Sequence, residues 1–348
     1  MNSRDLVRQV FEGEEPKKPP FLFESGQKDV EYKLGDIMVV HAWVPNWGTF
    51  MAEGGPFARK ELDRFEWSEK LDIDEYKWPE PDEVVQNTLE RIDMKKYAED
   101  RFVIFEVLGP TEQCEFFCKP PPPISFPPGI TYPSLSRHCF DFSTLSEIRP
   151  EKARALYDRI AGYILELAKA GAEIDYVDAI RVADDLCSHV GPNYSREFIE
   201  ADYLRWHREF ARAAERKGKY SKLHTDGNLL VGGLMGKLAD IYDAIHPLDF
   251  MPKPTLADSL RWIDSIVEAR TLAEETVFFT GIPIEIMFRE EVSPNQIREI
   301  VRRLLSKHGK RRLVLSDTHR PYPGRSFTEA GAMLKVRAVK EEVREHGQ

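Results

Sequence analysis

The chain has 348 residues, of which 42% are apolar and 31% are charged, and its net charge is −10. The excess of acid argues against nucleic acids and anionic membranes as partners, because both are bound through basic patches. Neither a signal peptide nor an apolar run of about 18 residues is visible, so we expect a soluble, cytoplasmic protein. Four scattered cysteines favour reduced thiols over a disulfide framework.

The first hundred residues are less regular than the rest of the chain. Two apolar stretches, Phe21–Glu24 and Ile37–Val44, are candidate strands, whereas residues 61–82 are irregular and acidic. The first clear strand is Phe102–Leu108, a run of aromatic and β-branched residues. In residues 150–170 the apolar side chains recur at helical spacing, which predicts an amphipathic helix.

From there to the C-terminus, short apolar runs alternate with longer amphipathic segments. The predicted strands are Tyr176–Val182, Tyr220–Leu223, Leu248–Met251, Thr276–Gly281 and Arg312–Ser316. The predicted helices cover residues 195–218, 233–245, 256–270, 293–308 and 328–345. This alternation indicates βαβ units and a parallel sheet. Because no G-x-G-x-x-G turn marks a dinucleotide-binding fold, we predict one (β/α)8 TIM-barrel domain over residues 1–348, with an N-terminal helical extension.

A proline-rich segment, residues 119–133, follows the Phe102–Leu108 strand on the face where barrels build their active sites. Proline excludes a helix or an internal strand here. The segment is either a semi-rigid lid over the barrel mouth or a surface loop stiffened by polyproline II structure.

Polar side chains follow three predicted strands at their C-terminal ends. The three ends read Ala183-Asp184-Asp185, His224-Thr225-Asp226 and Asp317-Thr318-His319. Side chains two apart on a strand share a face, which pairs His224 with Asp226 and Asp317 with His319. Imidazoles and carboxylates around one mouth could bind a divalent metal, with His224, Asp226 and His319 as the ligands. The alternative is that these groups cap turns and bind one another.

Asp184 and Asp185 are adjacent, so only one of them is expected to face into the barrel, and we favour Asp185. A carboxylate in a partly desolvated mouth can act as a general acid or base because burial raises its pKa. His207 lies on a predicted helix and is expected to be solvated.

Taken in order, several segments resemble the uroporphyrinogen decarboxylase superfamily, in particular its corrinoid-dependent methyltransferase-like branch. The segments are RDLVRQVFEGEEPKKPPF, YKWPEPDE, the run from ADDLC to HTDGNL, and LVLSDTHRPYPGRSFTEAGAMLKVRAV. Members of this superfamily are (β/α)8 barrels. One branch decarboxylates uroporphyrinogen, and the other moves methyl groups between small methylated compounds and a corrinoid protein, or from that protein to a thiol, usually with zinc.

Two departures from the family patterns narrow the choice of activity. Uroporphyrinogen is polyanionic and its decarboxylases carry an arginine-rich R-Q-A-G-R segment, whereas residues 23–27 here contain no arginine and add Glu24. A polyanion would be repelled at this position. Thiol-methylating members bind zinc through H-x-C and a later cysteine, but this chain has Asp226 in the second position and no cysteine after Cys187.

The resemblance therefore implies an enzyme that moves a methyl group from a small methylated compound to a corrinoid carried on another chain, and we expect the methyl donor to be a methoxylated compound. The reaction would be assisted by a divalent metal, with zinc among the candidates, or by an acid. The expected residues are Asp184, Asp185 and His224 for catalysis, Glu24, Glu106 and Arg320 for substrate, and His224, Asp226 and His319 for metal.

Two alternatives stay open. The first is a decarboxylase-like lyase that acts on a smaller substrate, which would need a cationic anchor such as Arg181, Arg289 or Arg320. The second is a non-catalytic barrel that binds a ligand. The sequence also leaves open whether the chain forms a homodimer.

Overall fold

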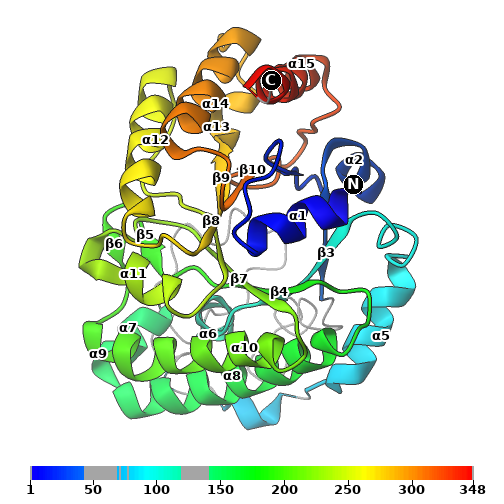
Figure 1. The fold of residues 1–348 in the computed structure, drawn as a ribbon. Coiled ribbons are helices and arrows are strands. Elements are labelled where there is room, and N and C mark those ends of the chain that lie inside the picture. The colour runs from blue at the N-terminus through cyan, green and yellow to red at the C-terminus, as the bar shows by residue number, and fades with distance from the viewer. Residues whose placement is uncertain (1, 43–68, 70–71, 77, 119–140, 347–348) are drawn as a thin grey trace.

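The computed structural model describes residues 2–42, 69, 72–76, 78–118 and 141–346. Eight parallel strands form one nearly closed barrel surrounded by helices, which confirms the predicted (β/α)8 fold (Figure 1). Neighbouring strands follow the order β1-β10-β9-β8-β7-β4-β3-β2. The strands are β1 (Phe21–Leu22), β2 (Ile37–His41), β3 (Phe102–Leu108), β4 (Ala179–Ala183), β7 (Tyr220–Thr225), β8 (Ala244–Pro247), β9 (Val277–Ile282) and β10 (Leu313–Asp317). A separate antiparallel pair, β5 (Cys187–Ser188) and β6 (Gly191–Pro192), follows β4.

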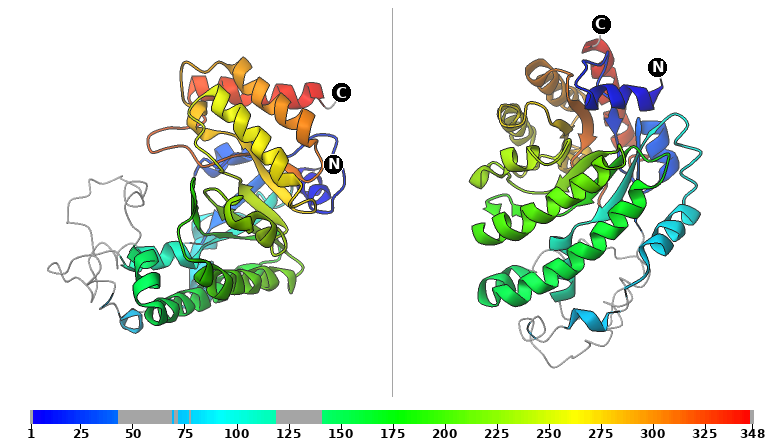
Figure 2. Two further views of the ribbon diagram at one scale, coloured as in Figure 1. Left: turned by 90° about the vertical axis from the view of Figure 1, so that its left-hand side faces the viewer. Right: turned by 60° about the horizontal axis from the view of Figure 1, so that its bottom comes forward.

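Helices cover the outside of the barrel. Their bounds are α1 (Ser3–Phe11), α2 (Lys28–Leu34), α5 (Pro81–Arg91), α6 (Pro110–Cys118), α7 (Asp141–Ile148), α8 (Pro150–Ala172), α9 (Arg196–Phe198), α10 (Leu204–Glu215), α11 (Leu234–Ala239), α12 (Leu256–Arg270), α13 (Ile284–Met287), α14 (Pro294–His308) and α15 (Ala330–His346). Short turns of helix are η1 (Ile73–Glu75), η3 (Ile199–Tyr203) and η4 (Val231–Gly233). Figure 2 shows α8 and α10 side by side on one flank and α12, α14 and α15 on another. No helix in the described part of the chain has the length and apolar character needed to cross a bilayer.

The predicted strand at Leu248–Met251 is wrong. The strand is Ala244–Pro247, whose first two residues pair with Lys222 and Leu223 of β7 and with Val277 and Phe278 of β9. The preceding helix ends at Ala239 and does not reach Ile245. The extended backbone stops after Pro247 because Leu248 has a positive φ of 65°, which an extended strand does not allow. The proline-rich segment 119–133 and Cys139 lie outside the described residues, whereas Cys114, Cys118 and Cys187 are buried.

The lower half of the barrel interior, at the N-terminal ends of the strands, is apolar. Helix α1 crosses this end and inserts Val7, Val10 and Phe11 between the inward side chains of the strands. The Phe11 ring stacks on Tyr220 with 4.3 Å between centroids and on Phe102 with 5.3 Å. Burial of these side chains closes the bottom of the barrel and leaves the opposite end for chemistry.

The upper half of the interior is polar. Inward positions recur every second residue along a strand, so the uppermost apolar side chain on a strand is followed two residues later by an inward side chain one level higher. On five neighbouring strands that side chain is ionisable: His41 on β2, Glu106 on β3, Arg181 on β4, Lys222 on β7 and His246 on β8. The strands therefore carry a layer of ionisable groups directly beneath the barrel mouth.

Candidate functional site

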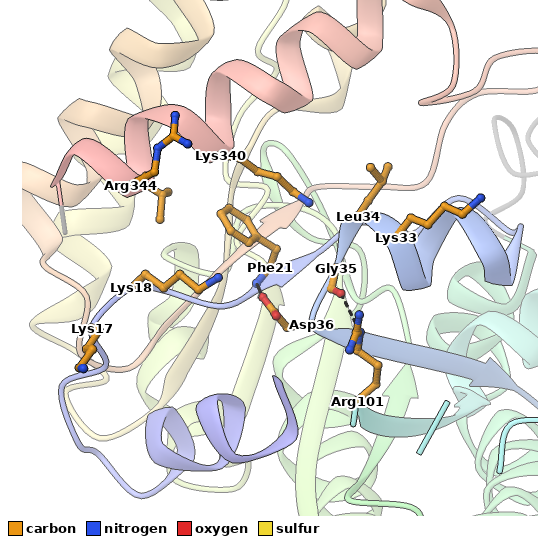
Figure 3. Close-up of a pocket in the computed structure, with 11 residues that line it drawn as sticks. Lys17, Lys18, Phe21, Lys33, Leu34, Gly35, Asp36, Arg101, Lys340 and Arg344 are labelled. Carbon is orange, nitrogen blue, oxygen red and sulfur yellow. Dashed lines mark hydrogen bonds between the residues drawn. The ribbon is translucent and has the colours of Figure 1, made fainter. Parts of the chain in front are cut away.

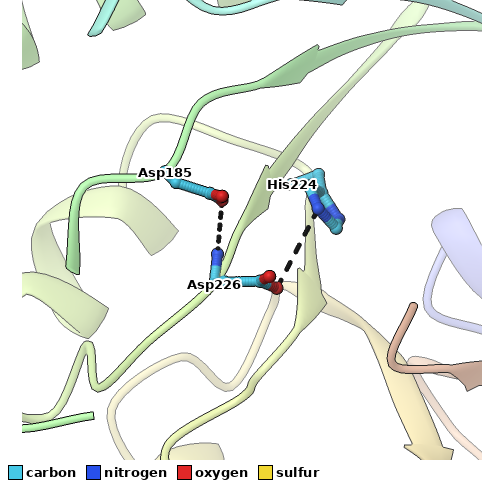
Figure 4. Close-up of side chains that lie close together, drawn as sticks. All are labelled: Asp185, His224 and Asp226. Carbon is cyan, nitrogen blue, oxygen red and sulfur yellow. Dashed lines mark hydrogen bonds and ion pairs between the residues drawn. The ribbon is translucent and has the colours of Figure 1, made fainter. Parts of the chain in front are cut away.

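Three side chains converge at the C-terminal ends of β4 and β7 (Figure 4). Asp185, His224 and Asp226 each present one atom suited to binding a metal, and these atoms lie within 4.8 Å of one another. The Asp226 backbone N–H donates to Asp185 Oδ1 at 2.8 Å, and His224 Nε2 lies 3.9 Å from Asp226 Oδ1. The structure thus brings two segments 40 residues apart in the chain into one polar cluster at the mouth.

The loops after β4 and β7 hold this cluster by close backbone contact. The Asn228 N–H donates to the Ser188 carbonyl at 2.9 Å, and the Leu186 N–H donates to Thr225 Oγ1 at 3.2 Å. Gly227 has a φ of +96°, and a Cβ at this position would lie 2.4 Å from the carbonyl oxygen of Cys187. Only glycine fits both the conformation and the approach, so Gly227 fixes Asp226 beside Asp185.

A chain of hydrogen bonds sets the protonation of His224. His246 Nε2 lies 2.8 Å from the Asp317 carbonyl oxygen, which can only accept, so this nitrogen carries a proton. The Nδ1 atoms of His224 and His246 lie 2.6 Å apart, and in the neutral His246 ring Nδ1 is the acceptor. His224 therefore donates from Nδ1 and keeps a lone pair on Nε2, the atom that faces Asp226.

Electrostatics keeps both imidazoles neutral. Burial and the nearby Arg181 charge lower the pKa of His224 well below its usual range. Burial, Lys222 and Arg181 lower the pKa of His246 in the same direction. A neutral imidazole with a free Nε2 lone pair can bind a metal or accept a proton.

The two aspartates have the opposite character. Burial raises the pKa of Asp226 well above its usual range, and the charges of Asp185 and Asp249 add to the effect. Burial also raises the pKa of Asp185, although the hydrogen bond from the Asp226 backbone opposes the shift. Both side chains are partly exposed at the mouth, and two carboxylates this close are stabilised by a proton or by a cation placed between them.

An ion-pair network lies directly beneath the cluster. The Arg181 guanidinium contacts Glu24 Oε1 and Glu106 Oε2, and Glu106 also contacts His41. Arg181, Glu24 and Glu106 are all at most 5% exposed. Burial alone would raise the pKa of Glu24, but the Arg181 and Lys222 charges outweigh it and hold that pKa well below its usual range.

Lys222 is the least satisfied group of this layer. Its side chain is fully buried, and Nζ has no hydrogen-bond partner among the described residues. The ammonium position lies 4.1 Å from the centroid of the Phe279 ring. Burial and the Arg181 charge lower the pKa of Lys222 well below its usual range.

Asp184 lies on the opposite side of β4 from the cluster, so it does not belong to the candidate site. Its carboxylate is fully buried and accepts from Thr111 Oγ1 at 2.9 Å, from the Glu112 N–H at 3.0 Å and from His207 Nε2 at 3.0 Å. The expectation that His207 is solvated is wrong, because this ring is fully buried between Asp184 and the Tyr242 hydroxyl, which lies 2.7 Å from Nδ1. Asp184 and His207 together tie α6 and α10 to the barrel wall.

Sequence reasoning placed His319 and Arg320 at the site, and the structure places both on the exposed turn after β10. His319 Nδ1 lies 3.0 Å from the Arg320 carbonyl, and His319 is not among the three clustered ligands. The chain turns at Thr318, so Asp317 and His319 do not share a face: Asp317 is buried and accepts from the Glu24 N–H at 3.0 Å. Glu24 and Glu106 lie inside the barrel in ion pairs, beneath the mouth.

The sequence interpretation missed His41, Lys222 and His246. His246 escaped notice because β8 was expected four residues too late in the chain. The two-residue alternation of inward side chains could have located it, because Ala244 and His246 on β8 are two residues apart, as are Tyr220 and Lys222 on β7. The interpretation also missed Asp249, which pairs with His189 at 3.1 Å and with the buried Lys253, and whose charge acts on Asp226.

No protein-family model and no curated protein matches the chain. Solved structures similar to it include a B12-independent methionine synthase from Shewanella sp. W3-18-1 (13% identity, 76% of this chain and 66% of that chain, TM-score 0.45). Others are an endo-β-1,4-mannanase from Thermotoga petrophila (11% identity, 90% and 70%, 0.45) and a GH27 β-L-arabinopyranosidase from Geobacillus stearothermophilus (12% identity, 96% and 78%, 0.43). The fold assignment rests on the strand order and not on these similarities.

Proposed function

We propose that the protein is a barrel enzyme that takes a methyl group from a small methoxylated compound at the mouth and passes it to a corrinoid held by a second protein. The observation that supports this proposal is the convergence of Asp185, Asp226 and the free Nε2 of His224 within 4.8 Å. This cluster places the nitrogen lone pair of His224 close to two carboxyl groups whose pKa values are raised, at the end of the barrel where active sites form.

The donor set fits a divalent cation. His224 Nε2 keeps a lone pair, and a positive charge would relieve the repulsion between Asp185 and Asp226. With one nitrogen, carboxylate oxygens and no thiolate, the set suits a harder ion than a cysteine site does. When bound there, such an ion would supply Lewis acidity for an ether oxygen. His224 and Asp226 would hold it, and His246 would orient His224.

The chain's own residues then have defined tasks in the methyl transfer. The O–CH3 bond breaks with its electron pair staying on the substrate oxygen, while the Co(I) corrinoid, the second substrate, donates the pair that forms the new Co–C bond. The released oxygen needs a proton. Asp185 is suited to donate it because burial raises its pKa and because, among the described residues, only its Oδ1 accepts a hydrogen bond, from the Asp226 N–H, which leaves Oδ2 to carry the proton.

The lyase alternative has less support from the geometry. A decarboxylase needs a free cation near the substrate carboxylate, but Arg181 is bound by both Glu24 and Glu106. Arg289 is paired with Glu291 at 3.6 Å, and Arg320 lies on the exposed turn after β10.

The direct test mixes the purified protein with a reduced corrinoid protein and a panel of methoxylated compounds, and follows the spectrum of methyl-cobalt. We expect methylation with at least one donor and a loss of roughly 100-fold or more in rate for His224→Ala and for Asp226→Asn. Asp240→Asn, an exposed aspartate at the end of α11, and His346→Ala on α15 are the matched controls and should retain full rate. The proposal fails if no donor methylates the corrinoid, or if Asp226→Asn is as active as Asp240→Asn.

A further inference from the structure

A second candidate site lies at the other end of the barrel from the polar cluster. A cavity of about 490 Å³ opens between the loop before β1, the end of α2, the start of β3 and the last turns of α15 (Figure 3). Six of its eleven lining residues are cationic and one is acidic. The cations are Lys17, Lys18, Lys33, Arg101, Lys340 and Arg344, and the acid is Asp36.

Most of this positive charge has no ion-pair partner in the described part of the chain. The Asp36 carboxylate is occupied, since Oδ2 accepts from the Phe21 N–H at 2.9 Å and Oδ1 accepts from Ser3 Oγ. Arg101 is also occupied, by the Gly35 carbonyl at 3.1 Å and by Asp100. For the other five cations, no ion pair with an acid occurs within the described ranges. In a chain with ten more acids than bases, five unpaired cations around one cavity indicate an anionic ligand.

The fold restricts the loop that carries Lys17 and Lys18. Lys17 and Lys18 stand between Pro16 and the pair Pro19–Pro20; all three prolines are buried and restrict the loop. The Phe21 ring lies between two ammonium groups, 6.0 Å from Lys18 Nζ and 5.7 Å from Lys340 Nζ. Burial lowers the pKa of Lys340, and the Lys18 and Arg101 charges add to this effect against the opposing charge of Asp36. A bound anion would relieve this crowding of like charges.

We propose that the cavity binds a small, multiply charged phosphate compound. Lysine ammonium groups approach an anion from several directions as point charges, which suits phosphate oxygens. The volume lies within the range of small-molecule sites, and the cations line one recess instead of forming the extended stripe that a nucleic acid requires. Because the cavity lies at the N-terminal ends of the strands and the Asp185 cluster at the C-terminal ends, this ligand would not be the substrate of the mouth.

The experiment titrates the full-length protein with sodium pyrophosphate in a calorimeter, at constant ionic strength, with sodium sulfate as a comparison anion. We expect one saturable site with micromolar affinity for pyrophosphate and weaker binding of sulfate. Lys18→Gln/Lys340→Gln should weaken pyrophosphate binding at least tenfold, as expected when roughly two charge-assisted contacts are lost. Pyrophosphate should also raise the melting temperature of the wild-type protein more than that of this double variant.

Two further variants make the result decisive. Lys95→Gln/Arg337→Gln removes the same charge from exposed positions outside the cavity, one of them on α15 itself, and should bind pyrophosphate like the wild type. His224→Ala, which alters the mouth, should also bind normally. The proposal is overturned if no saturable binding occurs up to about 10 mM pyrophosphate. It is also overturned if both double variants weaken binding equally, or if only His224→Ala abolishes it.

Discussion

On neighbouring strands of this barrel, an apolar inward side chain is followed two residues later by an ionisable one. On β3 the step runs from Ile104 to Glu106, and on β7 it runs from Tyr220 to Lys222. The lower level packs against α1 as a continuous apolar cluster, whereas the upper level is a layer of charges and imidazoles. A single strand can therefore contribute both to the apolar core and to the polar layer, because inward side chains recur at successive heights along the barrel axis.

The two levels should respond differently to mutation. The apolar level is stabilised by burial, so a small truncation loses only a little contact. The polar level contains desolvated charges that compensate one another, so removing one partner leaves the others buried and unpaired.

The largest loss of stability is expected for Arg181→Met. This change removes the cation that contacts both Glu24 and Glu106 inside the barrel. Glu24 would be left buried without its cation and Glu106 would keep only its contact with His41, at a cost of about 3–5 kcal/mol in the free energy of unfolding. Urea denaturation followed by circular dichroism measures it.

A triple variant that removes both carboxylates along with the cation tests whether unpaired charge causes that loss of stability. Arg181→Met combined with Glu24→Gln and Glu106→Gln removes all three charges together, and we expect it to recover a large part of the stability. If the triple variant is as unstable as Arg181→Met alone, the loss comes from packing and not from unpaired charge.

The adjacent pair Asp184 and Asp185 gives the second test. Asp184 accepts three hydrogen bonds in a fully buried position, so Asp184→Asn should cost roughly 2 kcal/mol in unfolding free energy. Asp185→Asn should change stability by less than about 0.5 kcal/mol, because its side chain is partly exposed, yet it should lower methyl transfer strongly. Unfolding curves and rates measured on both variants should therefore rank them in opposite order. Equal losses of stability would contradict the assignment of opposite faces.

Much of this architecture could be predicted from the sequence. The periods of two and 3.6 residues located most strands and the long helices, and the period of two also predicted that only one of Asp184 and Asp185 faces the barrel. The contacts of Arg181 with Glu24 and Glu106 could not be predicted, because they join β4 to β3 and to the segment after β1 only once the barrel closes. His246 was missed because a short strand before a proline gives little periodic signal. The expected pairing of Asp317 and His319 on one strand face failed because the turn at Thr318 ends the strand alternation.

His308, which lies outside the barrel interior, provides a test of how the stability of the protein depends on pH. His308, at the end of α14, has its pKa lowered to about 4 by burial and by the Arg270 charge. Because this pKa is lowered, the folded state resists protonation of His308. The contribution of His308 to the free energy of unfolding is therefore complete above about pH 6.5 and is lost as the pH falls toward 4. Between pH 7 and pH 5 this amounts to about 1–2 kcal/mol.

The measurement compares the wild type with His308→Gln in urea at both pH values. Carboxylates titrate in both proteins, so only the difference between them reports His308. The variant should lose less stability on acidification. An identical loss in both proteins would show that His308 keeps an ordinary pKa and that the acid response comes entirely from other groups, including the polar layer of the barrel.

The smallest combined effect on stability and on the rate of methyl transfer is expected in the apolar level, for Ile104→Val. Ile104 is fully buried in the cluster that α1 closes, two residues before Glu106 on the same strand. Removing one methylene there should cost about 1 kcal/mol in unfolding free energy, because the cavity is small and no polar group loses a partner. The rate of methyl transfer should stay unchanged, since the level above still holds Glu106 against Arg181. If Ile104→Val lowers the rate as much as His224→Ala does, the apolar level must position the mouth residues directly, and the division of the barrel into a stabilising half and a chemical half is wrong.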